Sequence, residues 1–346
     1  MMDERSGVTR CNLEKCHHSF TLYSSRSTET AHLIDIQGRE VHRWDYPQGE
    51  TWHYAHLLPD GHLVAIAKDI MILELDWDSR LVWKAETRAH HDFDRLPNGN
   101  TLVVSRRDLP NPWRDEGTLA LDILLEVTPG GEIVWEWKVE DHADEIGALV
   151  PLMMPPWPDF RDWPHINTLE ILPESPAAAA DPRFAAGNLL FCGRHIDTIG
   201  VIDRATGQVV WAWGPGELLG PHMPTMLPNG HLLVYDNGHN ASVRIRDYTR
   251  ILELDPVSGE IVWQFVADPP QSFYSPARGS NERLPNGNTF IAESNSGRLF
   301  EVTPEGEMVW EFLTPDVRPS GHRQALYRAL RYERPFVERL LAEHAQ

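Results

Sequence analysis

The chain has 346 residues, 41% of them hydrophobic and 24% charged, a composition typical of soluble globular proteins. No apolar run approaches a membrane span, and the polar N-terminal segment lacks the apolar core of a secretory signal. The net charge of −20 argues against binding to nucleic acid or to an anionic membrane. We therefore expect a cytoplasmic protein from the chain as given, or a periplasmic one if an export signal was removed, and the sequence leaves the oligomeric state open.

One phrase of sequence recurs along the chain: a Leu-Pro-Asn-Gly or Leu-Pro-Asp-Gly turn, two apolar strands, a short turn, and a strand ending in Val-Trp. The turns begin at Leu58, Leu96, Leu227 and Leu284, and the last strands end at Trp83, Trp135, Trp211, Trp263 and Trp310. Asn-Gly and Asp-Gly favour two-residue hairpins, because both positions of such a hairpin need positive φ. Each copy predicts four antiparallel strands, a small sheet that must stack on similar sheets, as the blades of a β-propeller do.

The copies predict an all-β protein in which residues 1–346 form a single six-bladed β-propeller domain of four-stranded antiparallel blades. Residues 19–46, completed by residues 322–332, form the blade that closes the ring by pairing the N- and C-terminal segments, which removes free sheet edges. Full blades are expected at residues 53–87, 90–138, 163–214, 222–266 and 279–312. Residues 140–162 are expected to form an insertion loop over one mouth of the channel, and residues 335–346 a short C-terminal helix.

Several of the 17 histidines are in phase with this repeat. His53, His91 and His222 precede their turns by the same number of residues, and His165 heads the matching strand of a blade whose turn is degenerate. In the last copy, the equivalent place adjoins Arg278. Because the first strand of each propeller blade lines the channel, equivalent positions on different blades converge near its mouth. One histidine before a turn is usually structural, but four in one register favour a functional site.

Other residues extend this constellation. Arg194 follows the second strand of the blade that begins with His165, and its planar guanidinium suits two-point contact with sulfate or phosphate. Asn237 stands at the matching place of the next blade, where it forms either an ordinary turn or a hydrogen bond that orients a histidine. Whether His90 or His91 faces the channel depends on strand register and is left open. The residues predicted to bind substrate are His53, His90, Asn167, His195, Asn237, Tyr274 and Arg278.

With these residues the chain resembles the arylsulfate sulfotransferase family, whose members are six-bladed propellers. The motifs that carry the resemblance are His-His-Asp at 90–92, Asp-Trp-Pro-His-Ile-Asn at 162–167, Gly-Arg-His at 193–195, Gly-Pro-His at 220–222 and Val-Tyr-Asp-Asn-Gly at 234–238. They form three elements: residues 90–92, residues 162–167 with 193–195, and residues 220–222 with 234–238. The three elements in this order are specific, whereas Leu-Pro-Asn-Gly and Val-Trp alone indicate only a propeller. The resemblance extends from Ala31 to Trp310.

The resemblance implies ping-pong transfer of a sulfuryl group from a small-molecule aryl sulfate to a phenol through a sulfohistidine, with no cofactor and no metal. Carried over by position, His222 resembles the nucleophile, while His91, His165 and Arg194 resemble the groups that hold the sulfate oxygens. A neutral imidazole can attack sulfur, and cationic groups can stabilise the oxygens of a loose transition state. A histidine could also exchange a proton with the phenol.

Two other readings remain open. Convergent imidazoles could bind copper, iron or zinc on the propeller axis, which would make the protein a metalloenzyme. Arg194 favours an anion over a cation at this place. A non-catalytic binding propeller is the other alternative, and it predicts no loss of function when His222 is replaced; a scaffold, however, has no need for histidines in one register.

Overall fold

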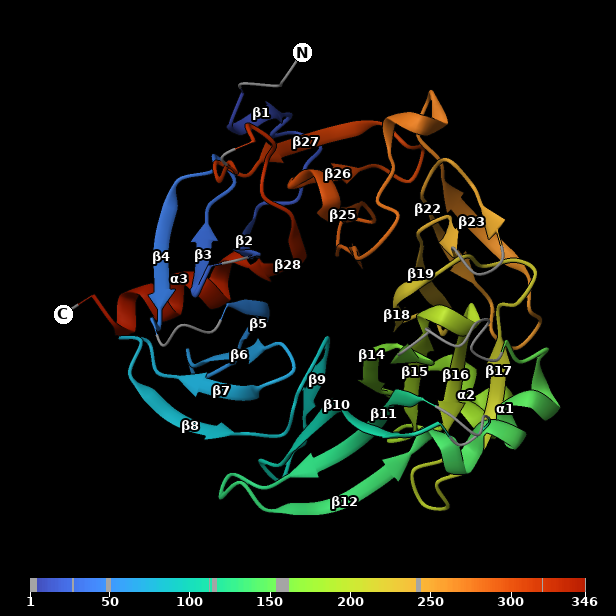
Figure 1. The fold of residues 1–346 in the computed structure, drawn as a ribbon. Coiled ribbons are helices and arrows are strands. Elements are labelled where there is room, and N and C mark those ends of the chain that lie inside the picture. Colours follow the sequence, from blue (N-terminus) through green and yellow to red (C-terminus); the bar gives the residue numbers. More distant parts are fainter. Residues whose placement is uncertain are drawn as a thin grey trace. The chain divides into compact units, whose positions relative to one another are not determined.

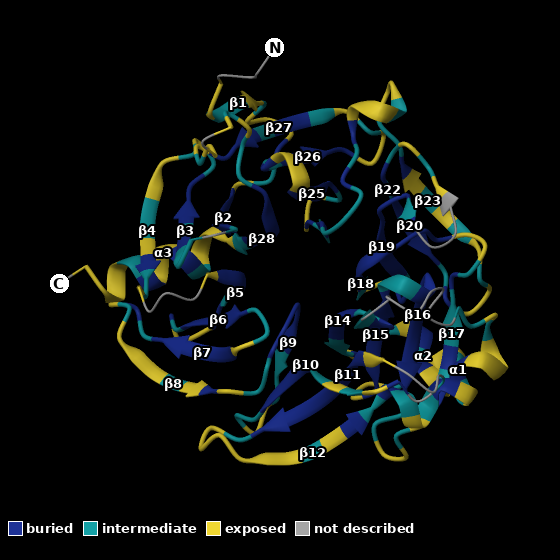
Figure 2. Ribbon diagram, viewed as in Figure 1, coloured by how far each residue is buried: buried dark blue, intermediate teal, exposed yellow. Residues whose placement is uncertain are grey.

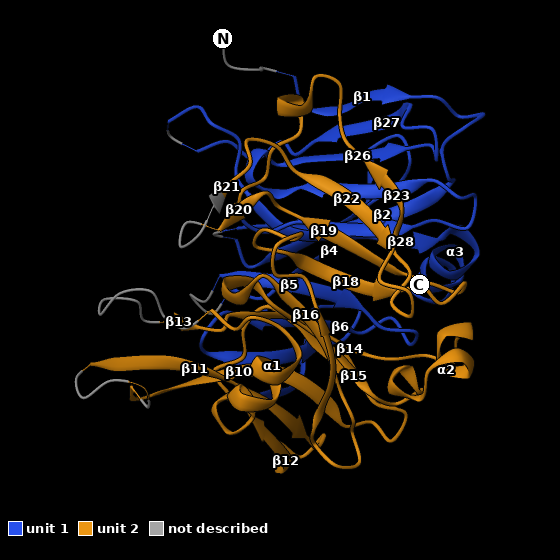
Figure 3. Ribbon diagram, turned by 90° about the vertical axis from the view of Figure 1, so that its right-hand side faces the viewer, with its two compact units in different colours: residues 1–86, 277–346 blue, residues 87–276 orange. Residues whose placement is uncertain are grey.

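The computed structural model describes residues 5–26, 28–47, 51–111, 113, 117–153, 162–240, 244–318 and 320–345. It is a six-bladed β-propeller with few helices, which confirms the fold predicted from the repeat (Figure 1). The chain divides into two compact units: unit 1 comprises residues 1–86 and 277–346, and unit 2 comprises residues 87–276 (Figure 3). Each unit contains three blades. One domain spanning residues 1–346 stays a prediction.

Unit 1 begins and ends in one sheet. Its strands are, in spatial order, β28 (Leu326–Glu333), β2 (Ser19–Ser25), β3 (Thr30–Ile34) and β4 (Glu40–Asp45). The antiparallel pairing of β28 with β2 confirms that the N- and C-terminal segments close one blade. The helix α3 (Arg334–Glu343) follows β28 and packs Val337 and Leu340 into the apolar core of this blade and the next.

The other two blades of unit 1 follow the predicted four-strand pattern, with one addition. One consists of β5 (Trp52–Leu57), β6 (Leu63–Ala67), β7 (Met71–Leu75) and β8 (Leu81–Ala85). The other consists of β24 (Ser280–Arg283), β25 (Thr289–Glu293), β26 (Arg298–Val302) and β27 (Met308–Leu313). Strand β1 (Gly7–Cys11), which the sequence analysis did not predict, pairs with β27 as a fifth strand.

Unit 2 contains the three blades that carry most of the predicted site. The first consists of β9 (Phe93–Arg95), β10 (Thr101–Pro110), β11 (Thr118–Val127) and β12 (Ile133–Lys138), with β13 (Asp162–Trp163) parallel to β11. The second consists of β14 (Ile166–Ile171), β15 (Leu189–Gly193), β16 (Thr198–Ile202) and β17 (Val209–Trp213). The third consists of β18 (His222–Met226), β19 (Leu232–Asp236), β22 (Arg250–Leu254) and β23 (Ile261–Phe265), and a small hairpin joins β20 (His239–Asn240) to β21 (Arg244–Ile245).

Part of the segment expected to be an irregular loop is helical. A 3-10 turn (Val139–His142) leads into α1 (Ala143–Leu149), which packs Ile146 into the core of unit 2. The prolines that predicted a loop all follow α1 in the sequence, so they do not prevent a helix before them. The rest of the predicted insertion includes residues 154–161, which lie outside the described residues.

The Leu-Pro-Asn-Gly turns are not the two-residue hairpins that the sequence predicted. In the first turn of unit 2, Leu96 N–H donates to Asn100 O (2.8 Å) and Gly99 N–H donates to Leu96 O (2.9 Å). Gly99 has φ of 86°, whereas Asn98 does not have positive φ. Proline fixes its own φ near −65°, which fits a type I turn followed by a left-handed glycine. Of the Asn-Gly pair, only Gly99 therefore adopts the left-handed backbone conformation.

In unit 2, side chains on or directly before the first strands link neighbouring blades. A carboxylate or hydroxyl oxygen of one first strand accepts a hydrogen bond from a backbone N–H of the next first strand. In unit 2 these pairs, at 2.9–3.0 Å, are Asp92 with Leu169, Asp94 with Ile171, Thr168 with Met223 and Glu170 with Met226. These polar ties fix the first strands that carry the histidines, while strands such as β8 and β12 lie largely exposed (Figure 2).

Candidate functional site

Three of the predicted histidines stand where a first strand of unit 2 begins. His91 precedes β9, His165 precedes β14, and His222 is the first residue of β18. His91 has φ of 64° and His165 has φ of 66°, which places both in the left-handed region. That region costs a residue other than glycine about 1–2 kcal/mol. Such strained residues concentrate at functional sites, so the two equivalent distortions support a special role for these positions.

Four histidines of unit 2 form a continuous group, the histidine cluster: His90, His91, His165 and His195. The His91 and His165 ring centroids lie 4.5 Å apart, and those of His165 and His195 also lie 4.5 Å apart. His90 Nδ1 lies 2.6 Å from His91 Nδ1, and the other ring nitrogen of His90 contacts Asp122. Of the two neighbouring histidines, His91 contacts His165, whereas His90 contacts His91.

Hydrogen bonds fix the tautomer of His91. His90 Nε2 lies 3.0 Å from Ser105 O, and because a carbonyl only accepts, this nitrogen carries a proton. A neutral His90 then has its lone pair on Nδ1, which accepts from His91 Nδ1–H. The remaining nitrogen of neutral His91, Nε2, carries the lone pair. His90 is buried, with 1% of its surface exposed, and its ring contacts His91; substrate binding by His90 stays a prediction.

Two aspartates that the sequence analysis did not select lie against the cluster. Asp162 Oδ2 lies 2.5 Å from His165 Nδ1 and 3.5 Å from Arg106 Nη1. Burial alone would raise the pKa of Asp162, but the charge and hydrogen bond of His165 hold it well below its usual range. Burial and the neighbouring charge of Asp162 raise the pKa of Asp122 well above its usual range. Of the two carboxyl groups, Asp162 therefore holds the negative charge.

His195 completes the cluster as a neutral base. Its Nδ1 lies 2.9 Å from the backbone carbonyl of Asp162, so this nitrogen donates and Nε2 carries the lone pair. Burial, together with the charges of His165 and Arg194, lowers the pKa of His195 to about 3. The imidazole is consequently uncharged near neutral pH.

His222 has the same tautomer, fixed by a separate set of bonds. Asn237 Nδ2 donates to Ser275 O (2.6 Å), which orients the amide so that its oxygen faces His222. His222 Nδ1 lies 2.7 Å from Asn237 Oδ1 and 3.2 Å from Gly220 O, and both oxygens only accept. Nδ1 therefore carries the proton and Nε2 the lone pair of this buried histidine. Of the two alternatives for Asn237, the structure therefore shows the hydrogen bond that orients a histidine.

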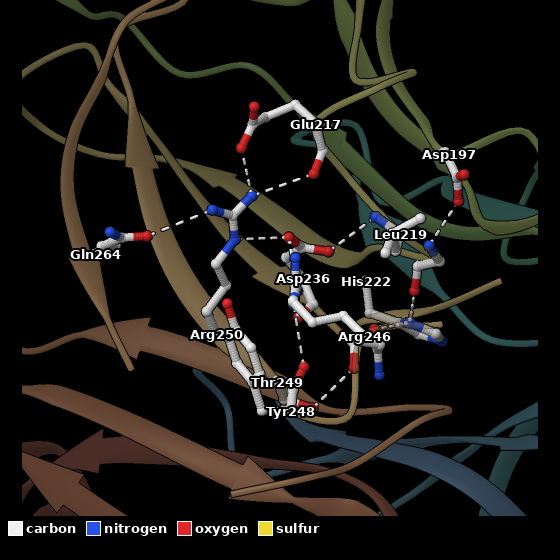
Figure 4. A network of polar contacts seen from close by, with 12 residues as sticks. Asp197, Glu217, Leu219, His222, Asp236, Arg246, Tyr248, Thr249, Arg250 and Gln264 are labelled. Carbon is white, nitrogen blue, oxygen red and sulfur yellow. Dashed lines mark hydrogen bonds and ion pairs between the residues drawn. The ribbon is translucent and has the colours of Figure 1, made fainter. Parts of the chain in front are cut away.

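An ion-pair network holds the segment that leads to His222 (Figure 4). Asp236 is fully buried and accepts from Leu219 N–H at 2.9 Å. Its other oxygen lies 2.8 Å from Arg250 Nε and 2.9 Å from Arg246 Nη2. Buried carboxylates are stable where cations and N–H donors satisfy them, as here. The network thus fixes both the loop before His222 and the strand end that carries Asn237.

Arg194 and Asn167 connect the blade of His165 to the loop before His222. Asn167 Nδ2 donates to Pro221 O at 2.8 Å, so this amide positions backbone, and its direct contact with substrate stays a prediction. Arg194 Nη2 donates to Pro276 O at 3.4 Å. A Cβ atom at Gly220 would lie 3.9 Å from Arg194 Cγ, which places the arginine beside the same loop.

The contacts described above do not include three of the residues predicted to bind substrate. His53 and Arg278 belong to unit 1, where the His53 ring lies 4.0 Å from the Tyr327 ring. Arg278 has φ of 71°, a left-handed conformation like those of His91 and His165. Tyr274 is partly buried in unit 2, and this burial raises its pKa. Substrate binding by these residues stays a prediction.

The sequence contained weak signals for the residues that were missed. Asp162 opens the very motif that contains His165. Asp122 interrupts an otherwise apolar run in β11, and Arg106 is its partner across the β10–β11 pairing. A charge inside an apolar strand is costly unless it is paired, so the interruption marked a position with a specific partner.

The fold and these contacts define a β-propeller with a histidine-rich polar site at the heads of its first strands. The chain belongs to the arylsulfotransferase (ASST) family, whose model matches residues 54–314, and this confirms the resemblance seen in the motifs. Family membership supports an aryl sulfotransferase activity in general, with a small-molecule aryl sulfate and a phenol as substrates.

Similar solved structures support the fold, and their sequence identity to this chain is too low to show more than the fold. A Bacteroides caccae protein of unknown function is 16% identical, with a TM-score of 0.56 over 91% of this chain and 99% of that one. A streptogramin B lyase is 11% identical, with a TM-score of 0.53 over 96% of this chain and 94% of that one. A search of curated proteins found no match. Within the described residues, no helix is long and apolar enough to cross a membrane.

Proposed function

We propose that the chain transfers a sulfuryl group from an aryl sulfate to a phenol in two half-reactions, with His222 as the nucleophile and a sulfohistidine between them. One observation carries the proposal: Asn237 Oδ1 and Gly220 O both accept from His222 Nδ1. The lone pair consequently lies on Nε2, and a neutral imidazole nitrogen with its lone pair available can attack sulfur.

The charges around the histidines support an anionic substrate. Arg194 and Arg106 bring guanidinium groups to an otherwise acidic protein, and Arg194 lies beside the loop that precedes His222. Planar guanidinium groups bind tetrahedral oxyanions through two parallel N–H donors. In this proposal Arg194 holds the sulfate oxygens together with His91 and His165, each of which donates to a sulfate oxygen when its Nε2 carries a proton. Positive charge opposite those oxygens stabilises the transition state.

Sulfoenzyme formation tests the nucleophile directly. Purified protein is incubated with 4-nitrophenyl sulfate, with and without phenol, and its intact mass is measured. We expect an adduct with the mass of one SO₃ group that phenol removes and that His222→Ala abolishes. Asn237→Ala should slow adduct formation by about 10- to 100-fold, the usual size of losses of a group that orients a catalytic residue. His231→Ala, which removes a histidine paired with Glu253 on a surface turn, is the matched control. An adduct that persists in His222→Ala would overturn the assignment.

One observation favours a second candidate, a metalloenzyme. Single ligand atoms of Asp162, His165 and His195 lie within 4.8 Å of one another, a set that suits a transition metal. Arg106 lies 3.5 Å from Asp162 Oδ2, and this cation opposes a metal there. Stoichiometric zinc, iron or copper in the purified protein, with neither turnover nor adduct, would favour the metalloenzyme. A non-catalytic propeller would give neither metal nor adduct.

A further inference from the structure

A buried threonine stands directly beyond the end of the β19–β22 pairing. The last paired residues of these two strands are Asp236 and Arg250, so Asn237 and Thr249 are the next residues on the two sides. Thr249 is fully buried, and its Oγ1 donates to Asn237 O at 2.9 Å. Thr249 also adjoins Arg250, which pairs with Asp236 in the network of Figure 4. The position of this hydroxyl is therefore set by the ends of two paired strands.

Two backbone hydrogen bonds tie Thr249 to the segment 273–276. Thr249 N–H donates to Phe273 O at 2.9 Å, and Ser275 N–H donates to Thr249 Oγ1 at 2.8 Å. A hydroxyl both donates and accepts, so Oγ1 gives its proton to Asn237 O and still receives Ser275 N–H. Ser275 O lies 3.4 Å from the same hydroxyl oxygen, a longer contact than that with Asn237 O. Thr249 thus joins the end of β19 to the segment 273–276.

The segment 273–276 reaches the site at two points. Ser275 O accepts from Asn237 Nδ2 at 2.6 Å, which turns Asn237 Oδ1 toward His222 Nδ1. Pro276 O accepts from Arg194 Nη2 at 3.4 Å. Ser275 presents its N–H to Thr249 and its carbonyl to Asn237, so the first hydrogen bond constrains the second. The Thr249 hydroxyl therefore supports the group that orients the Asn237 amide.

The direction of the Asn237 amide decides which nitrogen of neutral His222 carries the proton. With the amide oxygen toward the ring, as in the structure, Nδ1 donates and Nε2 carries the lone pair. If the amide turned over, its NH₂ group would meet Nδ1, which would then have to accept, and the proton would move to Nε2. A neutral imidazole with its proton on Nε2 has no lone pair there for an attack on sulfur. The orientation of one amide thus separates a reactive His222 from an unreactive one.

We propose that Thr249 is a positioning residue that sets the tautomer of His222. Its hydroxyl fixes Ser275, and the Ser275 carbonyl in turn fixes the Asn237 amide, which holds the proton of His222 on Nδ1. All four residues are buried, so bulk water does not compete for these donors and acceptors. The effect on rate rests on the proposed sulfuryl transfer, whereas the tautomer of His222 is measured without any substrate.

The test is Thr249→Val, which keeps the shape of the side chain and removes the hydroxyl. Nitrogen NMR of protein with isotope-labelled histidine reports which ring nitrogen is protonated, and the His222 signals are those that His222→Gln lacks. We expect wild type to carry the proton on Nδ1, and Thr249→Val to show a second form with the proton on Nε2. Sulfoenzyme formation from 4-nitrophenyl sulfate should slow by about 10-fold, as for a group that orients a catalytic residue. Thr249→Ser keeps the hydroxyl and should restore both the tautomer and the rate.

A second measurement shows whether Thr249 acts through Asn237. Thr249→Val should slow the reaction much less in an Asn237→Ala background, because the amide that the hydroxyl supports is already gone. A merely structural role would give the same loss in both backgrounds. Thr101→Val makes the same change at another buried threonine of unit 2 and should alter neither the tautomer nor the rate. Thr249→Ala, which adds no apolar methyl group, keeps the test decisive if Thr249→Val does not fold.

The outcomes separate this inference from the proposed function. A His222 ring that keeps the wild-type tautomer in Thr249→Val overturns the inference, and so does a wild-type ring with its proton on Nε2. An equal loss of rate with and without Asn237 overturns it as well. A wild-type protein that forms no sulfoenzyme overturns the proposed function instead, and the NMR measurement still decides whether Thr249 sets the tautomer.

Discussion

Asp197 should make the protein less stable as the pH rises from about 4 to 6. This aspartate is buried, with 2% of its surface exposed, and accepts from Gly220 N–H (2.6 Å) and Asn240 Nδ2 (2.9 Å). Burial raises its pKa from 3.8 to about 6, more than these two bonds lower it. The folded state thus binds the proton more tightly than the unfolded chain. Its stabilising effect is complete below pH 3.8 and is lost as the pH rises through 6. The raised pKa, by about two pH units, corresponds to about 3 kcal/mol.

Asp197→Asn should remove this dependence on pH and keep the fold. Asn keeps the oxygen that accepts from Gly220 N–H, and it tolerates the left-handed backbone of this position, where φ is 51°. Urea unfolding of wild type and variant at pH 4, 5, 6 and 7 gives the free energy of unfolding at each pH. Between pH 4 and 7 the difference between the two proteins should change by about 2–3 kcal/mol in favour of the variant. Glu260→Gln, an exposed change in the same unit, is the control. A difference that stays constant across this range would refute the reasoning.

Two further substitutions test the supports of His222. Gly220→Ala should lower the free energy of unfolding by more than about 2 kcal/mol and abolish activity, because φ is 61° there and the new Cβ would lie 2.3 Å from His239 O; a thermal midpoint equal to that of wild type contradicts this. Asp236→Asn should cost about 3–5 kcal/mol, because it removes the buried charge that pairs with both Arg246 and Arg250; denaturant unfolding measures the loss, and a change below about 1 kcal/mol would show that these pairs are not a buried support.

The fold was accessible from the sequence because its signal is repeated. The Leu-Pro-Asn-Gly or Leu-Pro-Asp-Gly turn recurs in four blades and the Val-Trp ending in five, so no single position had to be interpreted alone. The same repetition identified His91 and His222 by their phase relative to the turn, and His165 by its matching place at the head of a first strand in a blade whose turn is degenerate. Elements without a counterpart in other copies were missed: β1 is an addition to one blade, and α1 lies in an insertion.

The sequence could not provide the partners of the histidines, because these partners come from other strands. Asp122 and Asp162 approach the cluster only when β13 lies beside β11. Whether His90 or His91 contacts His165 depends on a local left-handed backbone, which the alternation of an ordinary strand does not predict. The protonation of each ring depends on which acceptor meets Nδ1, and this is a matter of distances between chain segments.

Those acceptors suggest how a propeller blade selects a tautomer. His222 begins β18, and Asn237 directly follows β19, the strand paired with β18. His90 precedes β9, and Ser105, whose carbonyl meets its ring, lies on β10, the strand paired with β9. In both blades, a group on or directly after the second strand contacts a histidine at the head of the first strand. Asn237 Oδ1 accepts from His222 Nδ1, whereas Ser105 O accepts from His90 Nε2, and His90 Nδ1 in turn accepts from His91 Nδ1–H. A buried ring nitrogen must be satisfied, and the hairpin satisfies Nδ1 directly in the blade of His222 and through His90 in the blade of His91. In neutral His222 and neutral His91, the opposite nitrogen, Nε2, then carries the lone pair.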